Sequence, residues 1–139
     1  MNTSPHVITR QVVLEMVGAS DLTPVEATLR YDPLDPYAVA VAFLVGGREV
    51  VWTFGRDLLM RGLSQPAGYG DVHVFPSLDA EGRAEIGLVL RSPAGQALVK
   101  ASVADVLEFL ARTTRAVWPG TEGEHVSADD TIAAILVGD

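Results

Sequence analysis

The sequence predicts an α+β fold: a mostly antiparallel sheet with a short helix in the middle of the chain and helices at its C-terminal end. Three observations favour it. Apolar and polar residues alternate through much of the first two thirds of the chain, Gly46-Gly47 separates two apolar runs, and the apolar spacing becomes helical after Ser102. Runs of strands followed by helices are typical of this class. The 139 residues fit one domain, residues 1–139.

The first part of the chain predicts four strands. Residues 7–16 are rich in β-branched side chains, and residues 25–31 alternate with a period of two. Residues 37–45 are almost wholly apolar, as in a strand covered on both faces. Gly46-Gly47 is a two-residue hairpin signal, so residues 48–54 are expected to be the antiparallel partner.

The middle of the chain predicts one short helix and about three more strands. Residues 56–63 have an apolar side, and Pro66 and Gly68 close this helix. Residues 70–75 alternate as a strand, and residues 85–91 and 96–101 form a second hairpin around Ser92-Pro-Ala-Gly95.

Two helices are expected after the last strand. Ser102 and Asp105 resemble a capping box, with Asp in place of the usual Glu, and Trp118-Pro-Gly120 ends the first helix. The apolar stripe predicted for this helix is Val103, Val106, Leu107, Leu110, Ala111 and Val117. Ser127 and Asp130 repeat the cap pattern and begin a last short helix. Its apolar residues are Ile132, Ile135 and Leu136.

Composition narrows the function. The net charge is −8, and the ten bases are scattered along the sequence, which disfavours a phosphate-binding face. The absence of cysteine excludes disulfides, thiolate nucleophiles and cysteine-based metal sites. There is no apolar run of the ~20 residues that a membrane span requires. The N-terminus lacks the apolar region of a signal peptide, so a cytoplasmic location is expected.

The stretch RYDPLDPYAVAVAF raises the question of whether Asp32 and Asp35 are a catalytic pair. Each precedes a proline, which fixes its own φ and moves the residue before it away from the helical region. Aspartate also stabilises turns through its side chain. The sequence therefore favours a rigid connector between two strands over a pair of working carboxylates.

The sequence also contains no complete metal site, nucleophile motif or phosphate-binding loop. His73 shares a strand face with Asp71, but two ligands do not make a metal site, and Glu122, Glu124 and His125 form a loop without a further ligand. No Gly-x-Ser-x-Gly motif occurs, and the glycine-rich residues 66–71 lack the lysine of a phosphate-binding loop. We expect no enzyme activity, no metal and no cofactor.

Two features suggest binding instead. The aromatic residues Tyr31, Tyr37, Trp52 and Phe54 could stack nucleobases, although core packing is the commoner explanation. The last predicted helix either docks on its own domain or binds a groove or a second subunit through Ile132, Ile135 and Leu136. Phe43, in the apolar strand, is expected in the core or at a subunit interface, so a polar replacement should unfold or dissociate the protein.

Several blocks in order resemble the SsgA-like proteins of sporulating actinobacteria, most of all the SsgB branch. They cover the chain from about residue 10 to 137. The blocks are LRYDPLDPYAVAVAF, VVWTFGRDLLMRGL, PAGYGDVHVFPS, LRSPAGQALVKA and WPGTE.

The resemblance implies a non-enzymatic regulator of sporulation-specific cell division. Such a protein helps to recruit or position the tubulin-like GTPase FtsZ at septa, together with an SsgA-type protein, in peripheral association with the divisome. It also implies a fold like that of the Whirly proteins and a bell-shaped homotrimer. Whirly relatives bind single-stranded nucleic acid, so a single-strand-binding module is the alternative function, which the acidic charge disfavours.

Overall fold

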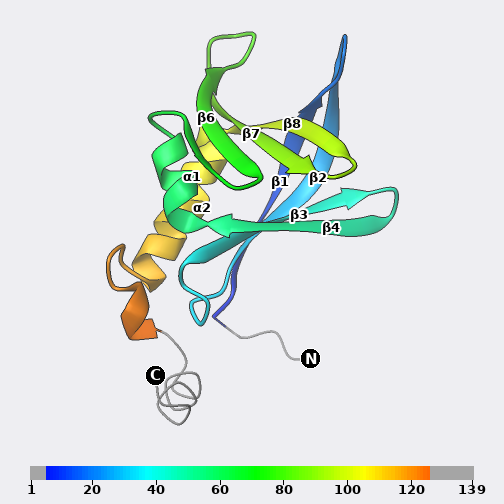
Figure 1. Ribbon diagram of the computed structural model, residues 1–139. Coiled ribbons are helices and arrows are strands. Elements are labelled where there is room, and N and C mark those ends of the chain that lie inside the picture. The colour runs from blue at the N-terminus through cyan, green and yellow to red at the C-terminus, as the bar shows by residue number, and fades with distance from the viewer. Residues whose placement is uncertain (1–5, 126–139) are drawn as a thin grey trace.

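The computed structural model describes residues 6–125 (Figure 1). Its strands are β1 (Ile8–Val17), β2 (Leu22–Tyr31), β3 (Ala38–Val45), β4 (Arg48–Gly55), β5 (Ala67–Tyr69), β6 (Val72–Leu78), β7 (Ala84–Ser92) and β8 (Gly95–Ser102). Its helices are α1 (Arg56–Gly62), α2 (Val103–Ala116) and a short 3-10 helix, η1 (Glu122–His125). The predicted α+β class with an antiparallel sheet is confirmed. The likeness to Whirly proteins stays a prediction.

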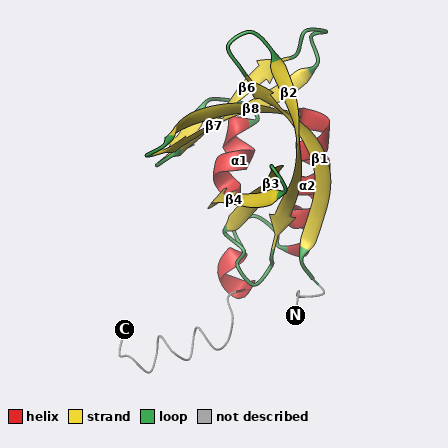
Figure 2. Cartoon of the chain, turned by 90° about the vertical axis from the view of Figure 1, so that its right-hand side faces the viewer, coloured by secondary structure: helices red, strands yellow, loops and turns green. Residues whose placement is uncertain are grey.

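All eight strands belong to one antiparallel sheet in the order β4-β3-β2-β1-β8-β7-β6-β5. Strands β1–β4 and β5–β8 are two groups of sequence neighbours. Only two residue pairs join these groups, Glu15 with Lys100 and Met16 with Val99. The sheet bends at this junction, so that the β3–β4 and β7–β8 hairpins lie opposite each other (Figure 2). Helices α1 and α2 lie inside the bend, where α1 contacts β4, β5 and β6 and α2 contacts β1, β7 and β8.

The core lies between the bent sheet and the two helices. Alternate residues of each central strand point inward, as the period of two predicts. On β2 these residues are Val25, Ala27, Leu29 and Tyr31, and on β7 they are Ile86, Leu88 and Leu90. One cluster of buried side chains joins both strand groups and both helices.

The strand boundaries differ from the prediction where proline is involved. β2 begins at Leu22 and includes Pro24, and β6 extends to Leu78 and includes Pro76. At both prolines the strand has a neighbour on one side only: β3 pairs with β2 from Ala27 to Arg30, and β5 pairs with β6 only as far as Val74. A strand tolerates a residue without N–H at such an open side.

Strand β5 was not predicted. It has three residues, too few to show an alternating pattern, and it forms by pairing with β6. A Cβ on Gly68 would lie 2.2 Å from His73 Nδ1, so the absence of a side chain makes room for the facing imidazole ring.

Two predictions for the apolar segments were partly wrong. The expected double coverage of β3 ends before its tip, where Leu44 and Val45 are exposed because the hairpin extends beyond the helices. In α2 the buried residues are Val106, Phe109, Leu110 and Thr113, whereas Leu107 and Ala111 of the predicted stripe are exposed. The packed face is therefore rotated toward Phe109 and Thr113.

The ends of α2 show one prediction confirmed and one wrong. The helix ends at Ala116, before Trp118-Pro-Gly120, and Gly120 adopts φ +94°, a conformation that favours glycine. Ser102 occupies the N-cap position, but its side chain makes no cap hydrogen bond. Asp105 instead accepts a hydrogen bond from Arg10 Nη2 at 2.7 Å, so its carboxylate fastens α2 to β1 rather than capping the helix.

Candidate functional site

Arg56 lies at the centre of a buried polar cluster where the chain passes from β4 to α1. Its side chain is 1% exposed. Nη1 donates to the carbonyl oxygens of Val117 at 2.8 Å and Thr113 at 3.2 Å, and Nη2 donates to Glu122 Oε2 at 2.9 Å. The guanidinium carbon lies 5.0 Å from the centre of the Tyr31 ring, within reach of a cation–π interaction. One side chain thus connects β2, α2 and η1.

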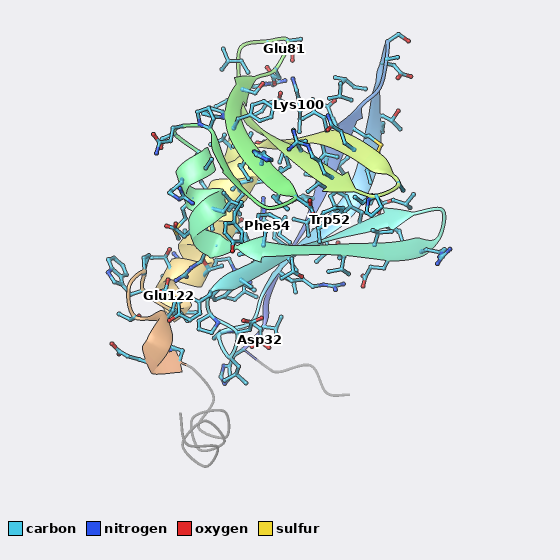
Figure 3. The ribbon with its side chains drawn as sticks, in the orientation of Figure 1. Asp32, Trp52, Phe54, Glu81, Lys100 and Glu122 are labelled. Carbon is cyan, nitrogen blue, oxygen red and sulfur yellow. The ribbon has the colours of Figure 1, made fainter. Side chains whose placement is uncertain are left out.

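Tyr31 and Asp32 form the neighbouring turn between β2 and β3. The Tyr31 hydroxyl donates to the carbonyl oxygen of Pro36 at 2.9 Å. Asp32 Oδ1 accepts from the Leu34 N–H at 3.0 Å, and the Asp35 N–H donates to the Asp32 carbonyl oxygen at 2.8 Å. Asp32 is therefore a turn residue in the connection between β2 and β3, where Figure 3 places it. The rigidity of this connection stays a prediction.

The electrostatics of the cluster follow from these contacts. The hydrogen bond from Arg56 holds the pKa of Glu122 below its usual value, and the Gly120 N–H, which donates to Glu122 Oε1 at 2.9 Å, acts in the same direction. Burial raises the pKa of Tyr31, because the charged phenolate would lose its hydration. At neutral pH the cluster therefore holds a guanidinium, a carboxylate and a neutral phenol, bonded to one another and to the backbone.

An apolar groove of about 320 Å³ opens between the β3–β4 and β7–β8 hairpins. Its floor consists of core residues, among them Phe43, Leu90 and Val99. Its open end is lined by Val45 and Val50, which are 48% and 45% exposed. Trp52 lies between the two hairpins, as Figure 3 shows. The groove thus offers aliphatic and aromatic surface from both strand groups to a binding partner.

The structure places only some of the predicted site residues. Phe43 is buried in the core and lines the groove. Ile132, Ile135 and Leu136, with the whole predicted last helix, lie outside the described residues. Their role as contacts therefore stays a prediction.

The aromatic residues divide into two groups. Tyr31 and Phe54 are buried, and Trp52 is partly buried against the core, which confirms core packing for these three. Tyr37 is an exception, because its side chain is exposed beside the turn. His73 lies on β6 against Gly68. Across residues 6–125, no three His, Asp or Glu side chains gather closely enough to bind a metal ion.

Most bases of the chain are engaged with acids. Of the ten, six form ion pairs with acids of residues 6–125: Arg10, Arg30, Arg56, Arg61, Arg83 and Lys100. The other four are Arg48 on β4, Arg91 on β7 and Arg112 and Arg115 on α2. They are divided among three elements. Within residues 6–125, no helix has the length and apolar content to cross a bilayer.

Sequence reasoning missed the groove. The signal was present, since Val45 and Val50 flank the predicted Gly46-Gly47 turn and a hairpin tip is usually solvated. What the sequence does not contain is the bend that brings the β7–β8 hairpin opposite this tip. The Arg56 cluster was missed as well, although Tyr31, Arg56 and Glu122 each lie in a block that carries the family resemblance.

Comparison with known proteins gives a consistent result. Residues 25–122 match the family model described as "Streptomyces sporulation and cell division protein, SsgA". The sporulation-specific cell division protein SsgB of Streptomyces coelicolor is 44% identical over 138 residues, which is 98% of each chain. The SsgB of Salinispora tropica is 42% identical over 139 residues and covers 96% of each chain.

Two solved structures resemble the whole fold. One is SsgB from work on mutations that correlate with longitudinal cell division during sporulation of Streptomyces coelicolor. It has a TM-score of 0.81 and 43% identity, over 86% of this chain and 94% of the other. The other is an SsgA-like sporulation-specific cell division protein of Thermobifida fusca, with a TM-score of 0.84 and 39% identity, over 96% of this chain and 98% of the other. From the matching blocks, the shared fold and these relatives, the chain belongs to the SsgA family of sporulation and cell division proteins.

Proposed function

We propose that this protein is a non-enzymatic regulator of sporulation-specific cell division that helps to recruit or position FtsZ at septa, together with an SsgA-type protein. Membership of the SsgA family supports a role in sporulation and cell division. The recruiting role follows from the family resemblance, with the protein acting as a homotrimer in peripheral association with the divisome.

A binding role is supported by the internal contacts of the residues that lie in the family's sequence blocks. Tyr31, Arg56 and Glu122 are bonded to one another or to the backbone, and Asp32 is occupied in a turn. Residues held in this way fix a framework rather than attack a substrate. The apolar groove, by contrast, leaves surface available for a partner. A molecule built like this acts through the surface that it presents.

The distribution of charge supports a protein partner over a single-stranded nucleic acid. A site that follows a polyanion needs a continuous cationic path. Here six of the ten bases are already neutralised by acids, and the remaining four lie on three different elements.

Sedimentation with polymerised FtsZ tests the proposal. We expect the protein to pellet with FtsZ filaments in the presence of GTP, alone or after addition of an SsgA-type protein, and to remain in the supernatant without FtsZ. In sporulating cells, a fluorescent fusion should form ladders that coincide with FtsZ. Absence of association under both conditions in vitro would refute the recruiting role. Salt-sensitive shifts of single-stranded DNA would favour the alternative.

A further inference from the structure

The apolar groove has a deep floor and an open end. Phe43 and Val99, in its floor, are almost fully buried, whereas Val50 at the open end is 45% exposed. Val50 lies on β4, which is an edge strand of the sheet. Aliphatic side chains entering from outside would therefore find a mainly apolar surface from the rim to the core, with Ser92 and Gln96 as its polar residues. The volume of about 320 Å³ accommodates a few such side chains.

We propose that this groove binds the C-terminal segment, residues 126–139, of a second copy of the chain. The segment contains Ile132, Ile135 and Leu136 at the spacing i, i+3, i+4, which places three aliphatic side chains on one side of a helix. Amphipathic helices bind apolar grooves through anchors at this spacing.

Charge complementarity favours the same occupant. Residues 126–139 contain Asp129, Asp130 and Asp139 and no base. Arg48 lies on β4 two residues before Val50. Because alternate residues of a strand point to the same face, Arg48 lies on the groove side of β4, near the open end. Among the described residues Arg48 makes no ion pair, whereas six of the other bases do. Asp129 and Asp130 lie just before the apolar residues, and in the proposed complex their carboxylates would form ion pairs with Arg48.

The length of the chain favours a second copy over the molecule's own segment. η1 ends beside the β2–β3 turn, since a Cβ on Gly123 would lie 3.6 Å from Tyr37 Oη. The groove lies toward the other end of β3, and Phe43 is roughly 20 Å along the strand from Tyr37. With residues 127–132 helical, the chain from His125 reaches only about 15 Å to Ile132. By this estimate Ile132 would fall short of Phe43 in the molecule's own groove, which favours a second copy as the source of the segment.

An exchange of this kind also fits a ring. When a segment of one copy enters a groove on the next, the contact joins two different surfaces, and such contacts close into a ring when the rotation between neighbouring copies completes a full turn. The inference rests on the self-association in the proposed function and is independent of FtsZ recruitment.

Point variants of the full chain test the docking by sedimentation velocity over a range of concentrations. Val50→Asp places a charge in the groove, and Val51→Asp is its matched control, since Val51 is similarly exposed on the opposite face of β4. In the segment, Ile135→Asp is paired with Ala134→Asp, which lies off the apolar stripe. We expect V50D and I135D to raise the apparent dissociation constant of self-association by about tenfold or more, as loss of an anchoring contact does, with both controls near wild type.

Mixing the two defective variants distinguishes exchange between copies from docking within one molecule. I135D keeps an intact groove and V50D keeps an intact segment, so an equimolar mixture should form a one-to-one complex at concentrations where each variant alone, weakened by about tenfold or more, does not assemble. A synthetic peptide of residues 126–139 should dissociate the wild-type assembly.

Several results would overturn the proposal: a monomeric wild-type protein, assembly that survives I135D, or a mixture that remains monomeric. If circular dichroism shows V50D to be unfolded, I135D and the peptide decide the question. FtsZ sedimentation of the same variants is measured separately. Normal assembly without FtsZ binding would contradict the recruiting role and leave the exchange intact.

Discussion

Arg56 illustrates how a single charged residue can be buried without a large loss of stability. A guanidinium removed from water needs partners for its donors, and Arg56 finds two carbonyl oxygens, one carboxylate and the face of an aromatic ring. These partners come from three parts of the chain, so the cluster holds the C-terminal end of α2 and η1 against the β2–β3 turn.

Replacing Arg56 by methionine should therefore be severely destabilising. The variant leaves Glu122 Oε2 and the Val117 carbonyl oxygen without their donor. The Glu122 side chain is 17% exposed, so the loss should lie toward the lower end of the about 3–5 kcal/mol that breaking a buried ion pair costs. Urea unfolding followed by circular dichroism measures the change. Arg61→Met is the control, because Arg61 on the same helix makes an exposed ion pair with Asp57 whose loss costs at most about 1 kcal/mol. Equal effects of the two substitutions would contradict the structural role of Arg56.

Glu122 makes the stability of the fold dependent on pH. Its pKa is lowered in the folded state by Arg56, so it contributes stability above its unfolded pKa of about 4.3 and loses that contribution as the pH falls through the lower folded value. In unfolding experiments, the difference between wild type and Glu122→Gln should be largest at neutral pH and should shrink below about pH 4. Glu124→Gln, exposed on the same 3-10 helix, is the control. A constant difference across this range would show that the carboxylate charge contributes nothing.

At the scale of elements, local patterns and distant contacts determine different features. Alternation predicted β2, the Gly46-Gly47 turn predicted the first hairpin, and the change of period predicted α2, because each depends on neighbours in sequence. The capping box at Ser102 failed because Arg10, far away in the chain, binds Asp105. β5 was missed because its three residues form a strand only through β6. The groove and the Arg56 cluster depend on the bend of the sheet, which has no local signal.

Helix α1 packs closely on β6 through Gly62, and this contact gives an element-scale prediction. A Cβ at Gly62 would lie 2.1 Å from Val74 Cγ1, and Val74 is fully buried. Gly62→Ala should therefore push α1 away from the sheet and lower the free energy of unfolding by about 1–3 kcal/mol, as overpacking does. Gly55→Ala at the other end of the helix is the control, because its nearest neighbour would be 3.8 Å away. Unchanged stability of G62A would mean that α1 can shift freely.

The whole molecule consists of two four-stranded groups with little pairing between them. Two residue pairs alone would not make them one cooperative unit. Helix α2 compensates, because it contacts β1 in one group and β7 and β8 in the other, and the core cluster is continuous across both. Stability is thus shared by packing rather than by the sheet.

Unfolding in urea should therefore follow a single transition. Trp52 lies on β4 in the first group, and Trp118 follows α2, so the two tryptophans report on different parts of the molecule. Fluorescence of the Trp118→Phe and Trp52→Phe variants, each compared with its own far-ultraviolet circular dichroism, should give coincident midpoints. An earlier loss of signal from either tryptophan would reveal two separately folding halves.

The groove between the hairpins has a thermodynamic consequence for the rest of the chain. It is lined by residues of both strand groups, so anything that occupies it binds the folded state and is released when either group unfolds. By mass action, an occupant present at 100 times its dissociation constant adds about 2.7 kcal/mol to the stability of the entire fold. Occupancy would then raise the melting temperature of the whole fold, including strands such as β6 that do not line the groove.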